Sequence, residues 1–286
     1  MRILVLGSSG YLGNQLYKNL KSIKKARIFH NGLKRKKKNL TKFNELKEFI
    51  IRKRPNLIIN CSAMTNIDAC EINKKKSYKI NVSAIKNIFL IKKKFNLNFF
   101  FFHFSTDQVY DKKNNSLNSE SDKTYINNEY SKQKLIAESV CANQEASIFR
   151  INFFGKSLNK NSFDAWVHHS FSSKKNFFLF IDQNFSPLRI KTICEVIKLL
   201  IIKKKFIKGI FNLGSKNGMS KIQFAKIFAK KTLIYNNYYI PAKTNLICKV
   251  KRSKNMLLNV RKFEKTFKIR LPKLINEIKT EIKDNY

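Results

Sequence analysis

A tyrosine and a lysine four residues apart are the first pair of side chains in this sequence that could do chemistry together. Tyr130 and Lys134 lie near the start of residues 129–143, whose pattern predicts a helix, and residues four apart share one helix face. An ammonium group in that position stabilises the phenolate form of the tyrosine. Such a phenol can give its proton to a carbonyl oxygen while a hydride reaches the carbon.

The chain is rich in tyrosine and lysine, so the pair gains weight only from its context. Ser105, Thr106 and Asp107 follow an apolar segment over residues 98–104, which predicts a strand. The carboxyl ends of parallel strands are where sheets of this kind bind ligands. A hydroxyl group there could hydrogen-bond the carbonyl oxygen that the tyrosine protonates. The alternative is that these three residues only cap a turn.

The start of the chain predicts a turn that binds a nucleotide. An apolar strand over residues 3–6 runs into Gly7, Gly10 and Gly13, and a helix is expected to begin within this segment. Glycines let the backbone approach a pyrophosphate, and the free N–H groups at a helix start bind the anion. The spacing is GxxGxxG rather than GxGxxG. An ordinary tight turn would also use glycine, but three of the eight glycines in the chain stand here.

Acidic residues are missing from the position that selects NAD. In NAD-binding turns an Asp or Glu about twenty residues downstream binds the adenosine ribose hydroxyls, whereas this chain has no acidic residue before Glu45. The loop after the second predicted strand carries Lys34 and Arg35 instead, and basic side chains suit a 2′-phosphate. The sequence therefore favours NADPH over NADH, although lysine is abundant throughout the chain.

Apolar runs alternate with helical periodicity along the first half of the chain and predict an α/β fold. Runs without polar alternation are typical of parallel strands that helices cover on both faces, so we expect a Rossmann-like doubly wound parallel sheet. The predicted dinucleotide-binding domain spans residues 1–150 with returning segments from about 188–213, and a smaller substrate-binding lobe takes most of 151–286. Expected strands cover residues 3–6, 27–30, 57–61, 98–105, 147–152, 177–181 and 210–213, and expected helices cover residues 11–23, 43–53, 77–93, 129–143, 163–171, 192–202 and 221–231.

A net charge of +41 would ordinarily point to nucleic acid or to an anionic membrane surface. Lysine outnumbers arginine 49 to 10, whereas proteins that grip phosphates and bases rely on the planar fork of arginine. We therefore expect no nucleic-acid partner. No apolar run reaches the eighteen or so residues that span a bilayer, so no membrane association is expected. The lysine runs at 34–38, 74–76, 92–94 and 203–205 are predicted to form solvated surface.

Cysteine and histidine usage predicts a cytoplasmic protein without a transition-metal site. The five cysteines form neither CxxC pairs nor an even set, which is typical of reduced thiols in the cytoplasm. His103 lies in an apolar strand, and the adjacent His168 and His169 point in different directions on a predicted helix. No Cys or carboxylate stands at ligand spacing beside them, so no metal is expected.

Further motifs follow one another in a fixed order along nearly the whole chain. They comprise residues 7–13, 60–68 with Glu71, Asn81-Val82, 105–110, Tyr130 with Lys134, 150–155, Asp182-Gln183 with Ser186-Pro187, 209–213 and 267–272. In this order and spacing they resemble the extended short-chain dehydrogenase/reductase superfamily and, within it, the dTDP-4-dehydrorhamnose reductase family.

The resemblance implies that NADPH or NADH reduces the 4-keto group of a nucleotide-linked 4-keto-6-deoxy sugar, in deoxysugar or surface polysaccharide biosynthesis. It implies Tyr130 as proton donor, Lys134 on the nicotinamide ribose and Thr106 orienting the carbonyl. With the glycine turn and the two basic residues above, the cofactor-binding set becomes Gly7, Ser9, Gly10, Tyr11, Leu12, Gly13, Lys34, Arg35, Asn39, Leu40, Cys61, Ser62, Ala63, Thr65, Asn81, Tyr130 and Lys134. The implied substrate-binding residues are Thr65, Asp68, Thr106, Asp107 and Phe153.

Departures from the family pattern leave the identity of the sugar open. Residues 150–153 read Arg-Ile-Asn-Phe where the family often reads Arg-Thr-Ser-Trp, and residues 61–63 read Cys-Ser-Ala. One alternative is a sugar-nucleotide epimerase or dehydratase of the same superfamily, although Gln108 stands where a dehydratase would have an acid. Another is a non-catalytic NADP-binding regulatory homologue, which would be expected to lack the tyrosine and lysine pair. Assembly as a homodimer is also left open.

Overall fold

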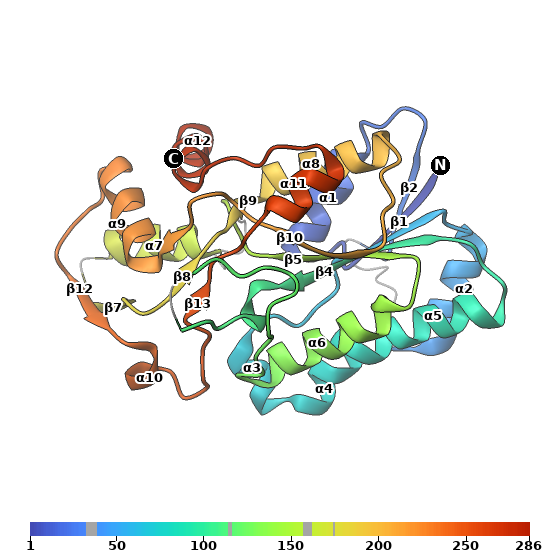
Figure 1. Cartoon of the computed structure of the whole chain (residues 1–286), viewed down its shortest axis with the longest axis horizontal. Helices are drawn as coiled ribbons and strands as arrows, with labels where there is room; N and C mark the ends of the chain where they lie inside the picture. The colour runs from blue at the N-terminus through green and yellow to red at the C-terminus, as the bar shows by residue number, and fades with distance from the viewer. Residues whose placement is uncertain (33–38, 114–115, 157–161, 174) are drawn as a thin grey trace. The chain divides into compact units, whose positions relative to one another are not determined.

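The computed structural model describes residues 1–32, 39–113, 116–156, 162–173 and 175–286 (Figure 1). These residues form two compact units. The first unit comprises Met1–Ser105, Asn128–Phe149 and Cys194–Phe211, and the second comprises Thr106–Asn127, Arg150–Ile193 and Asn212–Tyr286. Each unit is therefore assembled from segments that are distant in the sequence.

A six-stranded parallel sheet forms the centre of the first unit, with the strand order β2, β1, β3, β4, β5, β10. The chain passes from β1 to β2 on one side and then to β3 on the other side of β1, so the order reverses between β1 and β3. Sheets of this type bind ligands at such a reversal, outside the carboxyl ends of the strands. The strands are β1 Arg2–Leu6, β2 Arg27–His30, β3 Leu57–Asn60, β4 Phe100–Thr106, β5 Ala146–Ile151 and β10 Gly209–Leu213.

Helices cover both faces of this sheet, with α2, α5 and α6 on one face and α1 on the other (Figure 1). Leu4 and Leu6 of β1 are fully buried in a cluster that includes side chains of α2, α5 and α6. Ile3 and Val5 are equally buried, and they point to the opposite face because strand side chains alternate. The predicted doubly wound α/β fold is confirmed. The helices are α1 Tyr11–Leu20, α2 Phe43–Lys53, α3 Ile67–Ile72, α4 Lys74–Tyr78, α5 Ala84–Lys94 and α6 Glu129–Ala142.

The segment predicted as one helix over residues 77–93 is interrupted in the structure. After α4 the chain forms a π-helical segment, Lys79–Ser83, and only then α5. Asn81 in this segment is buried, and its carboxamide bonds both backbone groups of Met64, at 2.8 Å to the N–H and 3.1 Å to the carbonyl. The π-helical segment therefore carries a side chain that ties it to the loop after β3, a contact that periodicity alone could not predict.

The second unit has a core of aromatic side chains. α7 packs against α9, and Phe154, Phe171, Phe224 and Phe228 lie fully buried among them. Two-residue to four-residue strands form three small sheets in the orders β11-β8-β13, β12-β7 and β6-β9. The elements are β6 Phe153–Phe154, α7 Phe163–Ser172, β7 Phe177–Phe180, β8 Asn184–Phe185, β9 Leu188–Arg189, β11 Met219–Ser220, α9 Lys221–Lys231, β12 Tyr239–Ala242, α10 Thr244–Ile247, β13 Asn255–Met256, α11 Arg261–Phe267 and α12 Leu274–Asn285, while α8 Ile190–Ile202 runs on into the first unit.

Ion pairs with Arg189, one of them buried, hold α12 against β9 in the second unit. The Arg189 guanidinium lies 3.0 Å from the Glu281 carboxylate and 2.6 Å from that of Asp284. Glu277, also on α12, accepts a hydrogen bond from the Arg189 backbone N–H at 2.7 Å. The last helix is thus held by charged side chains as well as by apolar contacts. Across the described part of the chain, no helix combines the length and the apolar character needed to cross a membrane.

Candidate active site

The glycine turn after β1 is shaped by close approach of the backbone. Gly7 has a φ of +76°, and a Cβ atom there would come within 2.5 Å of the Ser62 nitrogen. A Cβ atom on Gly13 would lie 2.3 Å from the Gly7 carbonyl oxygen. Only glycine fits at these two positions, because both obstacles are backbone atoms. α1 begins at Tyr11 with Gly10 as its N-cap and no side-chain cap, so its first N–H groups suit an anion.

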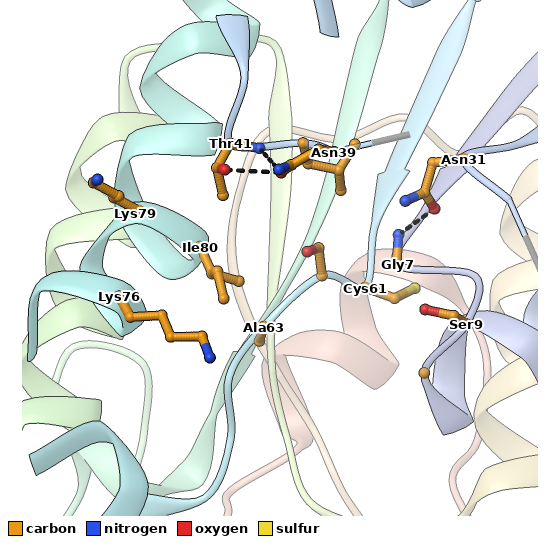
Figure 2. A pocket seen from close by; sticks show the side chains of 13 residues that line it. Gly7, Ser9, Asn31, Asn39, Thr41, Cys61, Ala63, Lys76, Lys79 and Ile80 are labelled. Carbon is orange, nitrogen blue, oxygen red and sulfur yellow. Dashed lines mark hydrogen bonds between the residues drawn. The ribbon is translucent and has the colours of Figure 1, made fainter. Parts of the chain in front are cut away.

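A cavity of about 540 Å³ opens beside this turn, within the first unit (Figure 2). The residues that follow β1, β2 and β3 form most of its wall, and α4 and the π-helical segment complete it. Two lysines and no carboxylate occur among the described lining residues, a composition that suits a ligand with phosphate groups. The lining residues are Gly7, Ser9, Gly10, Asn31, Asn39, Leu40, Thr41, Cys61, Ser62, Ala63, Lys76, Lys79 and Ile80.

Asparagine side chains hold the loops around this cavity. In each case the carboxamide oxygen accepts a hydrogen bond from a backbone N–H of a loop. A neutral carboxamide offers the same acceptor geometry as a carboxylate but carries no negative charge. The loops are therefore fixed without repelling an anion. The pairs are Asn31 with Gly7 and Ser8 (2.9 and 3.2 Å), Asn39 with Thr41 (3.0 Å), Asn60 with Ser62 (3.1 Å) and Asn81 with Met64 (2.8 Å).

One face of α6 carries the predicted tyrosine and lysine and a third residue that the sequence analysis did not single out. Tyr130, Lys134 and Glu138 follow at four-residue spacing, and all three are buried. The Lys134 ammonium donates a hydrogen bond to the Phe104 carbonyl of β4. The Ser105 hydroxyl donates a hydrogen bond to the Glu138 carboxylate. These contacts fix α6 against the carboxyl end of β4, where ligands bind in sheets of this type.

Burial changes the protonation of two side chains near the cavity. Burial lowers the pKa of Lys134 to about 8, although the neighbouring Glu138 carboxylate favours its charged form. Burial also raises the pKa of the Cys61 thiol, so Cys61 stays protonated at neutral pH and is no nucleophile. Cys61 lines the cavity, and the positive charge of Lys134 acts to lower the pKa of its thiol, against the larger effect of burial.

In the second unit a buried carboxylate lies close to a lysine. Asp107 accepts a hydrogen bond from the Asn152 side chain at 2.7 Å. Burial raises the pKa of Asp107 to about 7, and Asn152 and Lys221 act against that shift. Burial lowers the pKa of Lys221 to about 8, against the effect of Asp107. Near neutral pH Asp107 can donate or accept a hydrogen bond and Lys221 donates, which suits the hydroxyl groups of a sugar. Thr106 caps the short 3₁₀ turn Asp107–Val109 through its hydroxyl.

The structure gathers about half of the predicted cofactor residues around the cavity. Tyr11, Leu12 and Gly13 form the first turn of α1 instead, and Asn81 is buried beside the loop after β3. Lys34 and Arg35 lie outside the described residues. The predicted residues that line the cavity are Gly7, Ser9, Gly10, Asn39, Leu40, Cys61, Ser62 and Ala63.

The predicted substrate residues are distributed over both units. Thr65 is exposed in the loop before α3, and Asp68 is half-buried in the first turn of α3, both in the first unit. Thr106 and Asp107 belong to the second unit, as does Phe153, which begins β6. In the second unit, Asp107 is linked to Asn152, the neighbour of Phe153 in the chain.

Five residues that line the cavity did not come out of the sequence analysis: Asn31, Thr41, Lys76, Lys79 and Ile80. Lys76 belongs to the lysine run 74–76, for which the sequence predicts solvated surface. Figure 2 shows its amino group turned toward Ala63, whereas the amino group of Lys79 points away. Asn31 directly follows β2, near the position at which NAD-binding turns carry an acidic residue. Among the described residues, no group of three or more His, Cys, Asp or Glu side chains could hold a metal ion.

A family model covers the whole chain. The model described as the RmlD substrate binding domain matches residues 1–286. The chain belongs to the RmlD family. A solved dTDP-4-dehydrorhamnose reductase from Clostridium acetobutylicum is 25% identical to it, with a TM-score of 0.87 and 99% of both chains covered. A dTDP-4-dehydrorhamnose reductase from Bacillus anthracis, solved in complex with NADP, shares the fold with a TM-score of 0.87 and 99% of both chains covered, at 20% identity.

Relatives of this RmlD family member with curated names differ in what their names state. A "probable low-salt glycan biosynthesis reductase" of Haloferax volcanii is 26% identical over 176 residues, and the match spans 59% of this chain and 57% of that protein. The methionine adenosyltransferase 2 subunit beta of Mus musculus is 25% identical over 280 residues, spanning 92% of this chain and 81% of that subunit. The chain is thus similar both to proteins named as reductases and to a protein named as a subunit of another enzyme.

Proposed function

We propose that this protein uses NADPH to reduce the 4-keto group of a nucleotide-linked 4-keto-6-deoxy sugar to a hydroxyl group. The observation that carries the proposal is the buried face of α6, on which Tyr130 precedes Lys134 by one helical turn. The family supports this assignment, and the C. acetobutylicum neighbour is named for a reaction of this class.

The described residues fit a nicotinamide dinucleotide. Gly7 and Gly13 let the turn pack against backbone atoms that a Cβ atom would strike, and the uncapped start of α1 offers N–H groups to a pyrophosphate. Leu40 gives the cavity an apolar wall that suits the flat face of adenine. When bound, the reduced cofactor would supply a hydride to the carbonyl carbon.

Side chains of α6 would carry out the proton transfer to the keto oxygen. The Tyr130 hydroxyl would donate a proton to the keto oxygen as the carbon is reduced, which yields a secondary alcohol and leaves a phenolate. The charged form of Lys134, one turn along the same face, would stabilise that phenolate. Thr106 would orient the carbonyl oxygen. The bond from Lys134 to the Phe104 carbonyl holds the ammonium in place without neutralising it.

Sugar recognition is assigned to the residues that the family resemblance implies. Thr65, Asp68, Asp107 and Phe153 would contact the sugar. The five free cysteines accord with the cytoplasmic setting that we propose. The substitution of phenylalanine at position 153 for the tryptophan that the family often carries would alter the shape of the sugar site rather than the chemistry.

The direct test measures NADPH oxidation with a panel of 4-keto nucleotide sugars. The panel includes sugars linked to thymidine diphosphate and sugars linked to other nucleoside diphosphates. We expect turnover with at least one of them. Tyr130→Phe should lower kcat at least a hundredfold while leaving the affinity for NADPH within twofold. Tyr125→Phe is the matched control and should leave kcat unchanged, because Tyr125 lies outside the predicted site, in the segment that precedes α6. An active Tyr130→Phe variant would remove the tyrosine from the mechanism.

A second candidate is a regulatory subunit that binds NADP without turnover. The similarity to a methionine adenosyltransferase subunit over 92% of this chain favours it. It predicts NADPH binding with no oxidation against any sugar of the panel, and the same cofactor affinity in wild type and Tyr130→Phe. The panel therefore separates the two candidates.

A further inference from the structure

One lysine of the cavity beside the glycine turn has no part in the proposed reaction. Lys76 of α4 lines this cavity together with Ala63 and Ile80, and Figure 2 shows its amino group turned toward Ala63. Lys79 lines the cavity as well, but its amino group points away. Within the described lining, Lys76 is therefore the one side chain that directs a positive charge into the cavity.

Buried contacts hold the backbone that carries Lys76. Ser77, the next residue, is fully buried, and its hydroxyl accepts a hydrogen bond from the Gln133 side chain of α6 at 2.8 Å. Further along the chain, the Asn81 carboxamide bonds the two backbone groups of Met64 at 2.8 and 3.1 Å. Met64 belongs to the loop after β3, so these contacts fix α4 against the loop that the ammonium faces. The place of Lys76 at the cavity is thus set by buried groups, although its own side chain is exposed.

No carboxylate among the described residues neutralises the Lys76 ammonium. Glu71 of α3 pairs with Lys74 instead, at 2.9 Å, and the described lining of the cavity holds no acidic residue. Ala63 and Ile80, which lie beside the ammonium, have no side-chain acceptor to offer it. An ammonium has three N–H donors. A ligand atom that accepts a hydrogen bond would therefore find a charged donor here.

The position of Lys76 decides which part of a dinucleotide it would meet. The N–H groups at the start of α1 suit the pyrophosphate, and Figure 2 shows Gly7 and Ser9 of that turn on the side of the cavity across from Lys76. Leu40 and Ile80 give the cavity apolar surface, which suits the flat faces of a base. The edge of adenine carries ring nitrogens that accept hydrogen bonds. The base, rather than the pyrophosphate, would thus come within reach of the ammonium.

We propose that Lys76 recognises the base of the dinucleotide by donating a hydrogen bond from its ammonium to a ring nitrogen of adenine. This inference deepens the cofactor part of the proposed function and rests on it. It gives a binding role to one member of the lysine run 74–76, for which the sequence predicts only solvated surface. Lys75, its neighbour in the run, is exposed and does not line the cavity.

Lys76→Met tests the proposal, because methionine keeps much of the apolar stem and removes the donor. Titration of the full-length variant with NADPH, followed by nicotinamide fluorescence, should show an affinity about tenfold below that of the wild type, as expected for the loss of a hydrogen bond from a charged donor. Lys75→Met is the matched control and should bind NADPH within twofold of the wild type. An unchanged affinity in Lys76→Met, or equal losses in the two variants, overturns the proposal.

A second experiment separates contact with the base from contact with a phosphate. ADP and three analogues, in which N1, N3 or N7 of the base is replaced by C–H, compete with NADPH for the protein. The wild type should bind one of these analogues at least about fivefold more weakly than ADP, and this difference should vanish in Lys76→Met. The proposal fails if all four compounds bind the wild type alike, or if the difference persists in the variant. Wild-type protein that binds neither NADPH nor NADH would instead refute the proposed function, a distinguishable result.

Discussion

The two units fix their loops with different chemistry. In the first unit the loops around the cavity are held by neutral carboxamide oxygens, among them Asn31, Asn60 and Asn81. In the second unit several backbone N–H groups of loops donate hydrogen bonds to carboxylates instead. Examples are Asp111 with Lys254 (2.7 Å), Glu120 with Asn212 (2.7 Å), Asp164 with Gly155 (3.0 Å), Asp182 with Thr244 (3.0 Å), Glu277 with Arg189 (2.7 Å) and Glu281 with Lys156 (2.8 Å).

This difference follows from what each unit would bind. A carboxylate makes the stronger hydrogen bond to a backbone N–H, but beside a pyrophosphate it would add repulsion to the binding of the ligand. The hydrogen bonds from the loop N–H groups to carboxamide oxygens are therefore weaker than bonds to carboxylates would be, but they add no negative charge to the cavity. The second unit has no such constraint in its loops, and some of its carboxylates, such as Asp182 and Glu281, also pair with cations.

The largest effect is expected where the cavity depends on backbone geometry. Gly13→Ala would place a methyl group 2.3 Å from the Gly7 carbonyl oxygen, and backbone atoms cannot move aside. We expect NADPH affinity to fall at least about a thousandfold, equivalent to about 4 kcal/mol. Gly10→Ala is the graded control, since its Cβ would meet the same oxygen at 3.3 Å. Comparable binding by both variants, measured by titration, would show that close approach is not what builds the site.

The second unit should be sensitive to loss of charge instead. Arg189→Met leaves the buried Glu281 carboxylate without its partner, and breaking such a pair costs roughly 3–5 kcal/mol. Urea denaturation should report that loss in the free energy of unfolding, while NADPH affinity stays within twofold. Lys191→Met removes the exposed partner of Asp284 and should cost less than about 1 kcal/mol. Equal costs for the two variants would contradict the contrast between the units.

Asp107 should make the stability of the protein depend on pH. Its pKa of about 7 in the folded protein lies above the ordinary value of 3.8, so folding takes up a proton between about pH 4 and pH 7. The free energy of unfolding should therefore fall as pH rises through this window, by at most about 1.4 kcal/mol per pH unit from this group. Asp107→Asn should remove that part of the slope in urea titrations. An unchanged slope would mean that Asp107 is ionised in the folded state.

Glu138 of the first unit accepts a hydrogen bond from the Ser105 hydroxyl, and its replacement should have the smallest effect. Turnover should decline as pH rises through about 8, because Lys134 then loses its charge. Glu138→Gln withdraws a carboxylate that favours the charged lysine, so the alkaline limb of the pH profile should move to lower pH. Glu145→Gln, which removes an exposed carboxylate paired with Lys208 at 2.9 Å, should leave that limb in place.

Much of the fold and part of the site can be predicted from short segments. The strand before Gly7 and the face shared by Tyr130 and Lys134 depend on residues within about ten positions of one another, and local patterns specify them. The structure confirms the α/β fold and brings Gly7, Ser9 and Gly10 to one cavity with the residues after β3. The roles of Tyr130 and Lys134 in catalysis stay predictions, as do the substrate contacts.

By itself, the sequence determined the doubly wound sheet, the glycine turn and the family, because these rest on spacing along the chain. Only the tertiary structure decided which polar groups meet across long separations. In the folded protein the Lys76 amino group points toward the cavity, and Asn31 accepts a hydrogen bond from the glycine turn. Arg189 forms an ion pair with Glu281. The physical reason is that burial and pairing give a side chain its charge and direction, and both are properties of the packed molecule rather than of the chain.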